Sequence, residues 1–154
     1  MSALIEFDTV SGLLRGTERG PEDLPLLPAS EWTPGAEAGL LLAVEDEPAP
    51  EHAEARLIAV EFPAFHDGRG LSLAVLLRTR FGYAGELRAI GDVHPDLVHY
   101  LRRCGFDSFL LPEGRQISLQ EGVLAPHSDY YQASVTEPLP AFRRIRSQHY
   151  LGDR

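Results

Sequence analysis

The sequence predicts an α/β fold: a small, mostly parallel β-α-β-α-β sheet flanked by helices, with an irregular N-terminal segment. Three short apolar runs of strand length, at 57–62, 86–90 and 107–111, alternate with two apolar stripes at helical spacing. Strands that alternate with helices at this spacing favour a parallel sheet with right-handed crossovers. Because such a sheet places its ligand-binding residues at the carboxyl ends of the strands, we expect a functional site there.

Turn-forming residues delimit each of these elements. Pro63 ends the first strand, and Gly82 stops the helical stripe that follows it. Pro95 occupies a position that the first turn of a helix tolerates, and Gly105 ends that helix. Pro112 stops the third strand. The apolar residues of the two stripes are Leu73, Ala74, Leu77 and Phe81 in the first, and Leu97, Val98 and Leu101 in the second.

The 154 residues are expected to form one domain with two unlike parts. Residues 1–56 are interrupted by glycine and proline without a sustained period, which predicts an irregular acidic segment with one or two short strands. Residues 57–154 are expected to form the α/β core. Within the core, the spacing of a capping box predicts a further short helix at 118–121, and partial alternation predicts a last strand at 130–135.

Composition excludes several kinds of chemistry. The formal net charge is −9, and all 14 basic residues are arginine, so lysine is absent. A lysine Schiff base, a pyridoxal-phosphate enzyme and a phosphate-binding loop ending in GK[ST] are therefore excluded. The acidic total also argues against binding to nucleic acid or to an anionic membrane. The negative charge is concentrated in residues 1–63, with 13 acidic and 3 basic side chains, which we interpret as a solubilising or docking arm.

Targeting and cofactor signals are missing from the sequence. The N-terminus lacks the basic region of a signal peptide, and the apolar runs are too short to span a membrane, so a cytoplasmic location is expected. The single cysteine, Cys104, excludes an internal disulfide and a metal site built from thiolates. The histidines show no HExxH or HxH spacing, and GxGxxG, CxxC and haem-attachment motifs are absent, so we expect neither a metal nor a cofactor.

Asp67, Arg69 and Ser72 stand at the turn between the first strand and the first helix. The guanidinium of Arg69 could hold an oxyanion such as sulfite or sulfate between its planar donors, together with backbone N–H groups at the start of the helix. The alternative is structural: Asp67 or Ser72 caps the helix, and Arg69 forms a fixed ion pair. The sequence leaves these two interpretations evenly balanced.

Arg78 and Arg88 are the next candidates for ligand binding. Arg88 lies inside a predicted strand, where an arginine must pair with a carboxylate, extend to solvent or line a pocket. We expect pairing with Asp67, Glu86 or Asp92. Such pairing would still leave one edge of each guanidinium for a ligand.

Asp92, His94 and Cys104 complete the candidate residues, and no catalytic residue is assigned. Asp92 with His94 resembles an acid/base pair, but either residue is also a natural helix cap before Pro95, and we favour the cap. Cys104 follows two arginines, which favour a reactive thiolate. Because it ends a helix and lone cysteines are most often buried, we favour a packing role. Other charged residues at the strand ends are His66, Glu113 and Arg115.

The run from His66 to Phe109 carries a dense set of short motifs. They are Asp67-Gly68-Arg69, Ser72, Leu77-Arg78-Thr79-Arg80, Gly85-Glu86-Leu87-Arg88-Ala89, Gly91-Asp92-Val93 and Arg103-Cys104-Gly105-Phe106-Asp107, and Tyr131-Gln132 follows later. With its flanks, residues 57–135, this pattern resembles a bacterial family known as domain of unknown function 934. The sequence departs from the family at Gly70, where a larger residue is usual, and we expect a looser turn there.

The resemblance implies a place in assimilatory sulfite reduction, because members of the family are commonly encoded beside the genes of that pathway. The expectation is an accessory protein that contacts sulfite reductase or another sulfate-assimilation enzyme, with an arginine-lined oxyanion site at the strand ends. The alternative is a small cytosolic enzyme, a class often labelled oxidoreductase, that acts on a sulfur oxyanion or a related metabolite. Because redox cofactor motifs are absent, we prefer the accessory role and leave open whether the protein is an enzyme.

Overall fold

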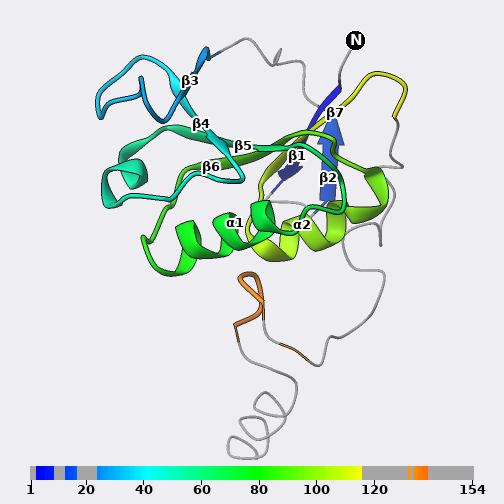
Figure 1. The fold of residues 1–154 in the computed structure, drawn as a ribbon. Helices are drawn as coiled ribbons and strands as arrows, with labels where there is room; N and C mark the ends of the chain where they lie inside the picture. The colour runs from blue at the N-terminus through cyan, green and yellow to red at the C-terminus, as the bar shows by residue number, and fades with distance from the viewer. Residues whose placement is uncertain (1–2, 9–12, 17–23, 116–131, 133, 139–154) are drawn as a thin grey trace, which may run out of the picture.

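The computed structural model describes residues 3–8, 13–16, 24–115, 132 and 134–138, which form one sheet with helices on one of its faces (Figure 1). The strands are β1 (Ala3–Asp8), β2 (Leu13–Gly16), β3 (Leu26–Pro28), β4 (Gly39–Ala43), β5 (Leu57–Phe62), β6 (Glu86–Gly91) and β7 (Ser108–Leu111). The helices are α1 (Arg69–Thr79), α2 (Val98–Cys104) and the short 3₁₀ turns η1 (Pro50–Glu54) and η2 (Pro95–Leu97). None of the helices in these described segments is both long and apolar enough to cross a membrane.

The strand order is β2-β1-β7-β6-β5-β4-β3, and five neighbouring strands are parallel. Strands β3 to β7 follow one another across the sheet in chain order. β1 pairs antiparallel with β7 and with β2, which closes that side of the sheet with a hairpin. The predicted α/β class, with a mostly parallel sheet and a β-α-β-α-β unit, is confirmed.

Both α-helices lie on the same face of the sheet (Figure 1). This arrangement follows from the strand order, because successive right-handed crossovers that advance in one direction place their helices on one face. Side chains alternate between the faces of a strand, so Val60, Ala89 and Phe109 point toward the helices and are fully buried. The rings of Phe62 and Phe106 extend this core, with centroids 5.8 Å apart.

The N-terminal residues contribute more to the sheet than the sequence predicted. Instead of one or two short strands, four strands precede residue 57, and β3 and β4 continue the parallel sheet. The loop between them carries Trp32, which is buried and donates from Nε1 to the Ala38 carbonyl at 3.1 Å. The described part of this segment is therefore built into the sheet and core, and the interpretation of it as an arm is wrong. The number of strands was underestimated because part of the pairing is distant: Leu4 of β1 pairs with Leu110 of β7.

Two predicted C-terminal elements fall largely outside the described residues. The short helix predicted at 118–121 lies wholly outside them. Of the strand predicted at 130–135, Gln132, Ser134 and Val135 are described, and none of the three belongs to a strand. Val135 instead donates its N–H to the Arg103 carbonyl at 3.1 Å, so this segment lies against the end of α2.

Gly70 packs closely against the core, so the expectation of a looser turn is wrong. It lies in the first turn of α1 and is buried. A Cβ atom at this position would stand 2.5 Å from a ring carbon of Phe62. The missing side chain therefore lets the start of α1 approach the end of β5, where the candidate site begins.

Candidate functional site

Asp67 and Arg69 form a two-pronged ion pair at the carboxyl end of β5. Asp67 Oδ1 accepts from the Arg69 backbone N–H at 3.1 Å and from Nε at 3.0 Å, and Oδ2 accepts from Nη2 at 2.7 Å. These hydrogen bonds lower the pKa of Asp67 to about 2, and those from the Arg69 side chain have a larger effect than the one from its backbone. The ion pair of the structural alternative is therefore present, and Asp67 also accepts from the first N–H of α1, but the N-cap residue itself is Gly68, not Asp67 or Ser72. The Ser72 side chain is exposed and has no hydrogen-bonding partner in the described segments.

The lowered pKa of Asp67 gives a pH-dependent contribution to stability. Because the folded pKa is below the ordinary value of 3.8, the pair stabilises the fold above about pH 4, and that contribution is lost as the pH falls toward 2. We expect the melting temperature of Asp67→Asn to fall less steeply than that of the wild type between pH 4 and pH 2. Added salt should shrink the difference, because Arg69 is exposed. Parallel melting curves for the two proteins across this window would contradict the assignment.

Asp92 ties together the loops that follow β5, β6 and β7. Its Oδ2 accepts from the Phe65 backbone N–H at 2.9 Å, and Oδ1 lies 2.6 Å from Nη1 of Arg115. The same nitrogen of Arg115 donates to the Val93 carbonyl at 2.9 Å. The pKa of Asp92 is lowered mainly by the hydrogen bond from the Phe65 N–H and, to a smaller extent, by the Arg115 guanidinium. Asp92 is thus an ionised linker between three loops.

His94 acts as a cap, as the sequence interpretation favoured. It precedes η2, and its Nδ1 accepts from the Asp96 N–H at 3.3 Å. In the neutral ring this leaves the proton on Nε2. The Phe65 ring is near two imidazoles: its centroid lies 5.6 Å from that of His94 and 5.3 Å from that of His66.

Phe65 and Arg115 were not among the predicted site residues. Arg115 was noted only as a charged residue beyond the third strand, and its contacts with Asp92 and Val93 span more than 20 positions that no local pattern connects. Phe65 carries no motif, but its side chain is 51% exposed. The carboxyl edge therefore combines two paired arginines, two ionised aspartates and the exposed Phe65 ring with its two neighbouring histidines.

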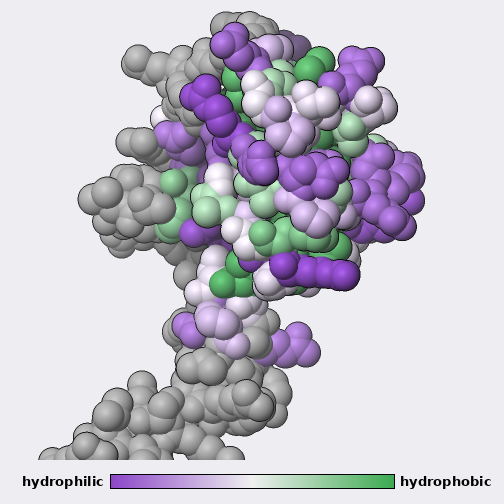
Figure 2. Space-filling model, turned by 90° about the vertical axis from the view of Figure 1, so that its left-hand side faces the viewer, coloured by the Kyte–Doolittle hydropathy of each residue, from purple (hydrophilic) through white to green (hydrophobic). Residues whose placement is uncertain are grey.

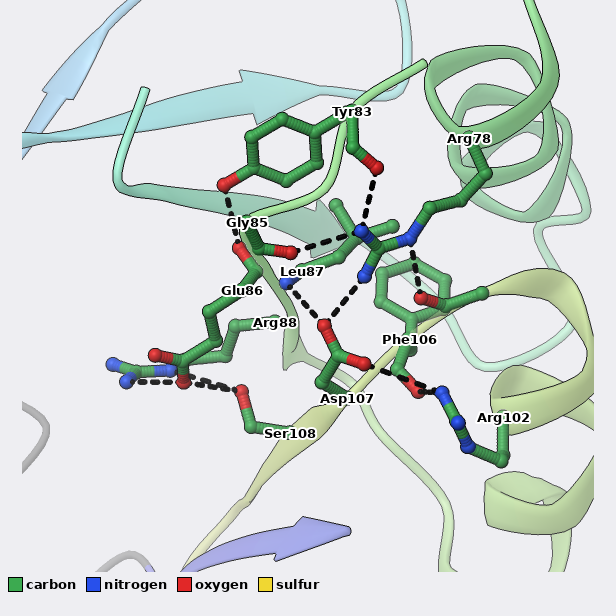
Figure 3. A network of polar contacts seen from close by, with 11 residues as sticks. Arg78, Tyr83, Gly85, Glu86, Leu87, Arg88, Arg102, Phe106, Asp107 and Ser108 are labelled. Atoms are coloured by element: carbon green, nitrogen blue, oxygen red, sulfur yellow. Dashed lines mark hydrogen bonds and ion pairs between the residues drawn. The ribbon is translucent and has the colours of Figure 1, made fainter. Parts of the chain in front are cut away.

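Arg78 lies at the opposite edge of the sheet, among the amino ends of β6 and β7 (Figure 3). Its Nε donates to the Gly105 carbonyl at 2.9 Å, and Nη1 donates to the carbonyls of Tyr83 and Gly85 at 2.8 and 2.9 Å. Nη2 donates to Oδ2 of Asp107 at 2.5 Å, so the carboxylate partner is none of the three that the sequence suggested.

Asp107 gathers two further donors at this edge (Figure 3). Its Oδ2 accepts from the Leu87 N–H at 3.1 Å, and Oδ1 accepts from Nη1 of Arg102 at 3.2 Å. The Arg102 guanidinium also stacks on Phe7, 4.0 Å from the ring centroid, and burial lowers the pKa of Arg102. These contacts hold both helix ends to β1, β6 and β7, which gives Arg78 a structural role.

Arg88 is also engaged within the fold, on the sheet face away from α1 and α2. It is buried in β6 and donates from Nη2 to Oε1 of Glu86 at 2.9 Å, so its predicted pairing with Glu86 is confirmed (Figure 3). Ser108, opposite Arg88 on β7, donates to the same Glu86 oxygen at 2.7 Å. Neither Arg88 nor Arg78 joins Asp67 and Arg69, so the predicted site residues fall into separate groups.

Cys104 is buried at the end of α2, which agrees with a packing role. Burial raises the pKa of its thiol, and this outweighs the opposite effect of the neighbouring Arg103 charge. Nowhere in the described ranges do three histidine, cysteine, aspartate or glutamate side chains gather as a metal site would require.

These features define a class: a small α/β protein with a one-sided helical layer and a carboxyl edge closed by ion pairs. A model of the family described as "Bacterial protein of unknown function (DUF934)" matches residues 40–142. The chain therefore belongs to this family, and the match begins at β4, upstream of the motifs from which the resemblance was drawn. No curated protein and no solved structure matches the chain.

Proposed function

We propose that the protein is a cytoplasmic accessory protein of assimilatory sulfite reduction that acts by contact with the sulfite reductase system. Membership of the family supports this proposal, through the pathway that the resemblance implies. In addition, the protein would bind a sulfur oxyanion weakly through Arg69 at the carboxyl edge of the sheet.

The charge state of the carboxyl edge supports a binding role over a catalytic one. On this observation we prefer the accessory protein to the small enzyme. A general base works best when its pKa is near the working pH. Asp67 and Asp92 both have a lowered pKa, so they are ionised and weakly basic near neutrality. His94 already uses one ring nitrogen as a cap. The edge therefore offers fixed charges and an exposed aromatic ring, which suit recognition.

Arg69 is the group best placed to contact an anion. Asp67 occupies its Nε and Nη2, whereas no hydrogen bond involves Nη1 among the described residues. Asp67 and Glu45 place negative charge near the guanidinium, and this charge raises the pKa of Arg69. Binding of sulfite is therefore expected to be weak and to depend on this one nitrogen.

Sulfite binding should disappear when Arg69 is replaced by glutamine. Isothermal titration with millimolar sulfite is expected to detect weak binding by the wild type and none by Arg69→Gln. Arg80→Gln is the matched control, because Arg80 is an exposed arginine at the other end of α1, away from the carboxyl edge. Equal heats for both variants and the wild type would remove Arg69 from the proposal.

Growth of a deletion strain tests the pathway assignment separately. Without the gene, growth should be impaired with sulfate as the sole sulfur source and normal with cysteine. The wild-type gene should restore growth on sulfate. Equal growth of the deletion strain on both sulfur sources would overturn the proposed function.

A further inference from the structure

The middle of the outward surface of α1 lacks the charge that normally covers a solvated helix. Between the exposed Arg69 and Arg80, the exposed positions Ser72, Val75 and Thr79 recur at helical spacing, and residues 70–77 include no charged side chain. The three exposed large hydrophobic side chains of the described chain, Phe65, Val75 and Tyr100, lie on or beside this surface. Clustering of this kind is typical of an interaction site.

These side chains border a groove along α1 and α2, which we call the helix groove. Its larger hollow has a volume of about 430 Å³, in the range of ligand pockets. A smaller hollow beside it shares Tyr100 and is also bordered by Phe65 and Leu97. The lining of the larger hollow consists of Val75, Thr79, Tyr100, Arg103, Cys104, Gln132, Ser134, Val135 and Pro138.

One wall of the helix groove is a bent piece of this same chain, in which the Ser134 N–H donates to the Glu137 carbonyl at 2.8 Å. Val135 donates its N–H to the Arg103 carbonyl at 3.1 Å, and Arg103 Nη2 donates to the Gln132 carbonyl at 3.1 Å. Val135 and Pro138 thereby present apolar atoms to the hollow. The end of α2 therefore already contacts a peptide segment with apolar side chains, and within the described part of the chain the space between this segment and α1 is a hollow.

The charged side chains at the groove indicate which charge a bound segment would carry. Among the described residues that line the larger hollow, Arg103 is the one charged side chain, and Arg80 is exposed directly after Thr79. The carboxylate in the lining of the smaller hollow, that of Asp92, is paired with Arg115. Figure 2 shows apolar residues gathered low on the body, at the height of the helices in Figure 1, with mostly hydrophilic residues above them. An apolar segment flanked by acidic residues would complement this arrangement.

We infer that the helix groove is the surface through which this protein contacts its partner protein, and that the partner inserts an apolar segment flanked by acidic residues. An apolar side chain of that segment fills the hollow between Val75 and Tyr100 above Cys104, and its acids face Arg80 and Arg103. This inference rests on the proposed function, because it assigns a surface to the proposed contact with sulfite reductase.

Binding to purified sulfite reductase, measured by biolayer interferometry, tests the assignment. Val75→Glu and Tyr100→Glu place a negative charge in the groove, and each is expected to weaken binding at least tenfold. Thr33→Glu adds the same charge at an exposed position in the loop between β3 and β4, and it should bind as the wild type does. All three replaced side chains are exposed, so melting temperatures should stay within a few degrees of the wild type and establish that each variant folds.

The single cysteine gives a second measurement on the same surface. Alkylation of Cys104, followed by mass spectrometry of its peptide, should slow when sulfite reductase is bound to the wild type and not when it is added to Val75→Glu. Unchanged affinity in both groove variants would overturn the inference and leave the proposed function standing. Absence of binding by the wild type would overturn the proposed function and the inference with it. A wild-type dimer that Val75→Glu converts to a monomer would assign the groove to a second copy of the chain and overturn the partner assignment.

Discussion

Replacing Arg78 with alanine is expected to destabilise the fold by about 3 kcal/mol or more. The side chain is mostly buried and its three nitrogens donate to three backbone carbonyls and to Asp107. Alanine would leave these acceptors without their donor, and an unsatisfied buried acceptor costs about 1–3 kcal/mol. Two segments distant in the chain would lose this link, since the acceptors belong to the loop after α1 and to the turn between α2 and β7.

Urea unfolding of three variants would measure this effect. Arg80→Ala is the matched control, because within the described segments its exposed side chain makes a ring contact with Phe81 alone, and it should cost about 0.5 kcal/mol or less. Arg78→Lys should recover little of the loss, because one ammonium cannot reach acceptors that a planar guanidinium spans. A cost for Arg78→Ala no larger than that for Arg80→Ala would contradict the structural role of Arg78.

The core strands that the sequence predicted are those with a proline or glycine signal at one or both ends. Leu57–Phe62 stands as predicted, and β6 and β7 differ from their predicted ranges by one residue at one end. Proline and glycine mark these boundaries, and such signals act within a few residues. β1 has no such boundary signal, and besides its hairpin partner β2 it pairs with β7, about a hundred residues away.

The same distinction, between local signals and distant contacts, explains why the positions of some site residues were predicted correctly and those of others were not. Asp67, Arg69 and Asp92 come shortly after strands, so the topology of a parallel sheet places them at the carboxyl edge. Arg78 is at the far end of a helix, and its orientation depends on acceptors up to 29 positions away. A sequence motif records that an arginine is present, but the acceptor that fixes it is set by tertiary packing.

Gly91→Ala is the second substitution with a large expected effect, with a cost of about 2–4 kcal/mol. Gly91 ends β6 with a φ of +85°, a conformation that side chains rarely adopt. A Cβ atom there would clash with the Phe62 carbonyl oxygen, which is backbone on the neighbouring strand β5 and cannot rotate away. That same oxygen accepts from the Asp92 N–H at 2.8 Å, so relief of the clash must move the residue that links the three loops of the carboxyl edge.

Gly35→Ala separates the two causes of this cost. Gly35 has nearly the same φ, +86°, but an added Cβ atom would meet nothing within 4 Å, so its substitution should cost only the conformational strain of about 1–3 kcal/mol. The excess loss in Gly91→Ala then measures the clash with β5. The pKa of Asp92, followed by NMR, should rise toward its ordinary value in Gly91→Ala alone, because its hydrogen bond from Phe65 depends on the spacing of these two strands. Equal unfolding free energies and an unchanged Asp92 pKa would mean that the strand ends can adjust independently, and the carboxyl edge would then not be the rigid, ion-paired surface on which the binding role depends.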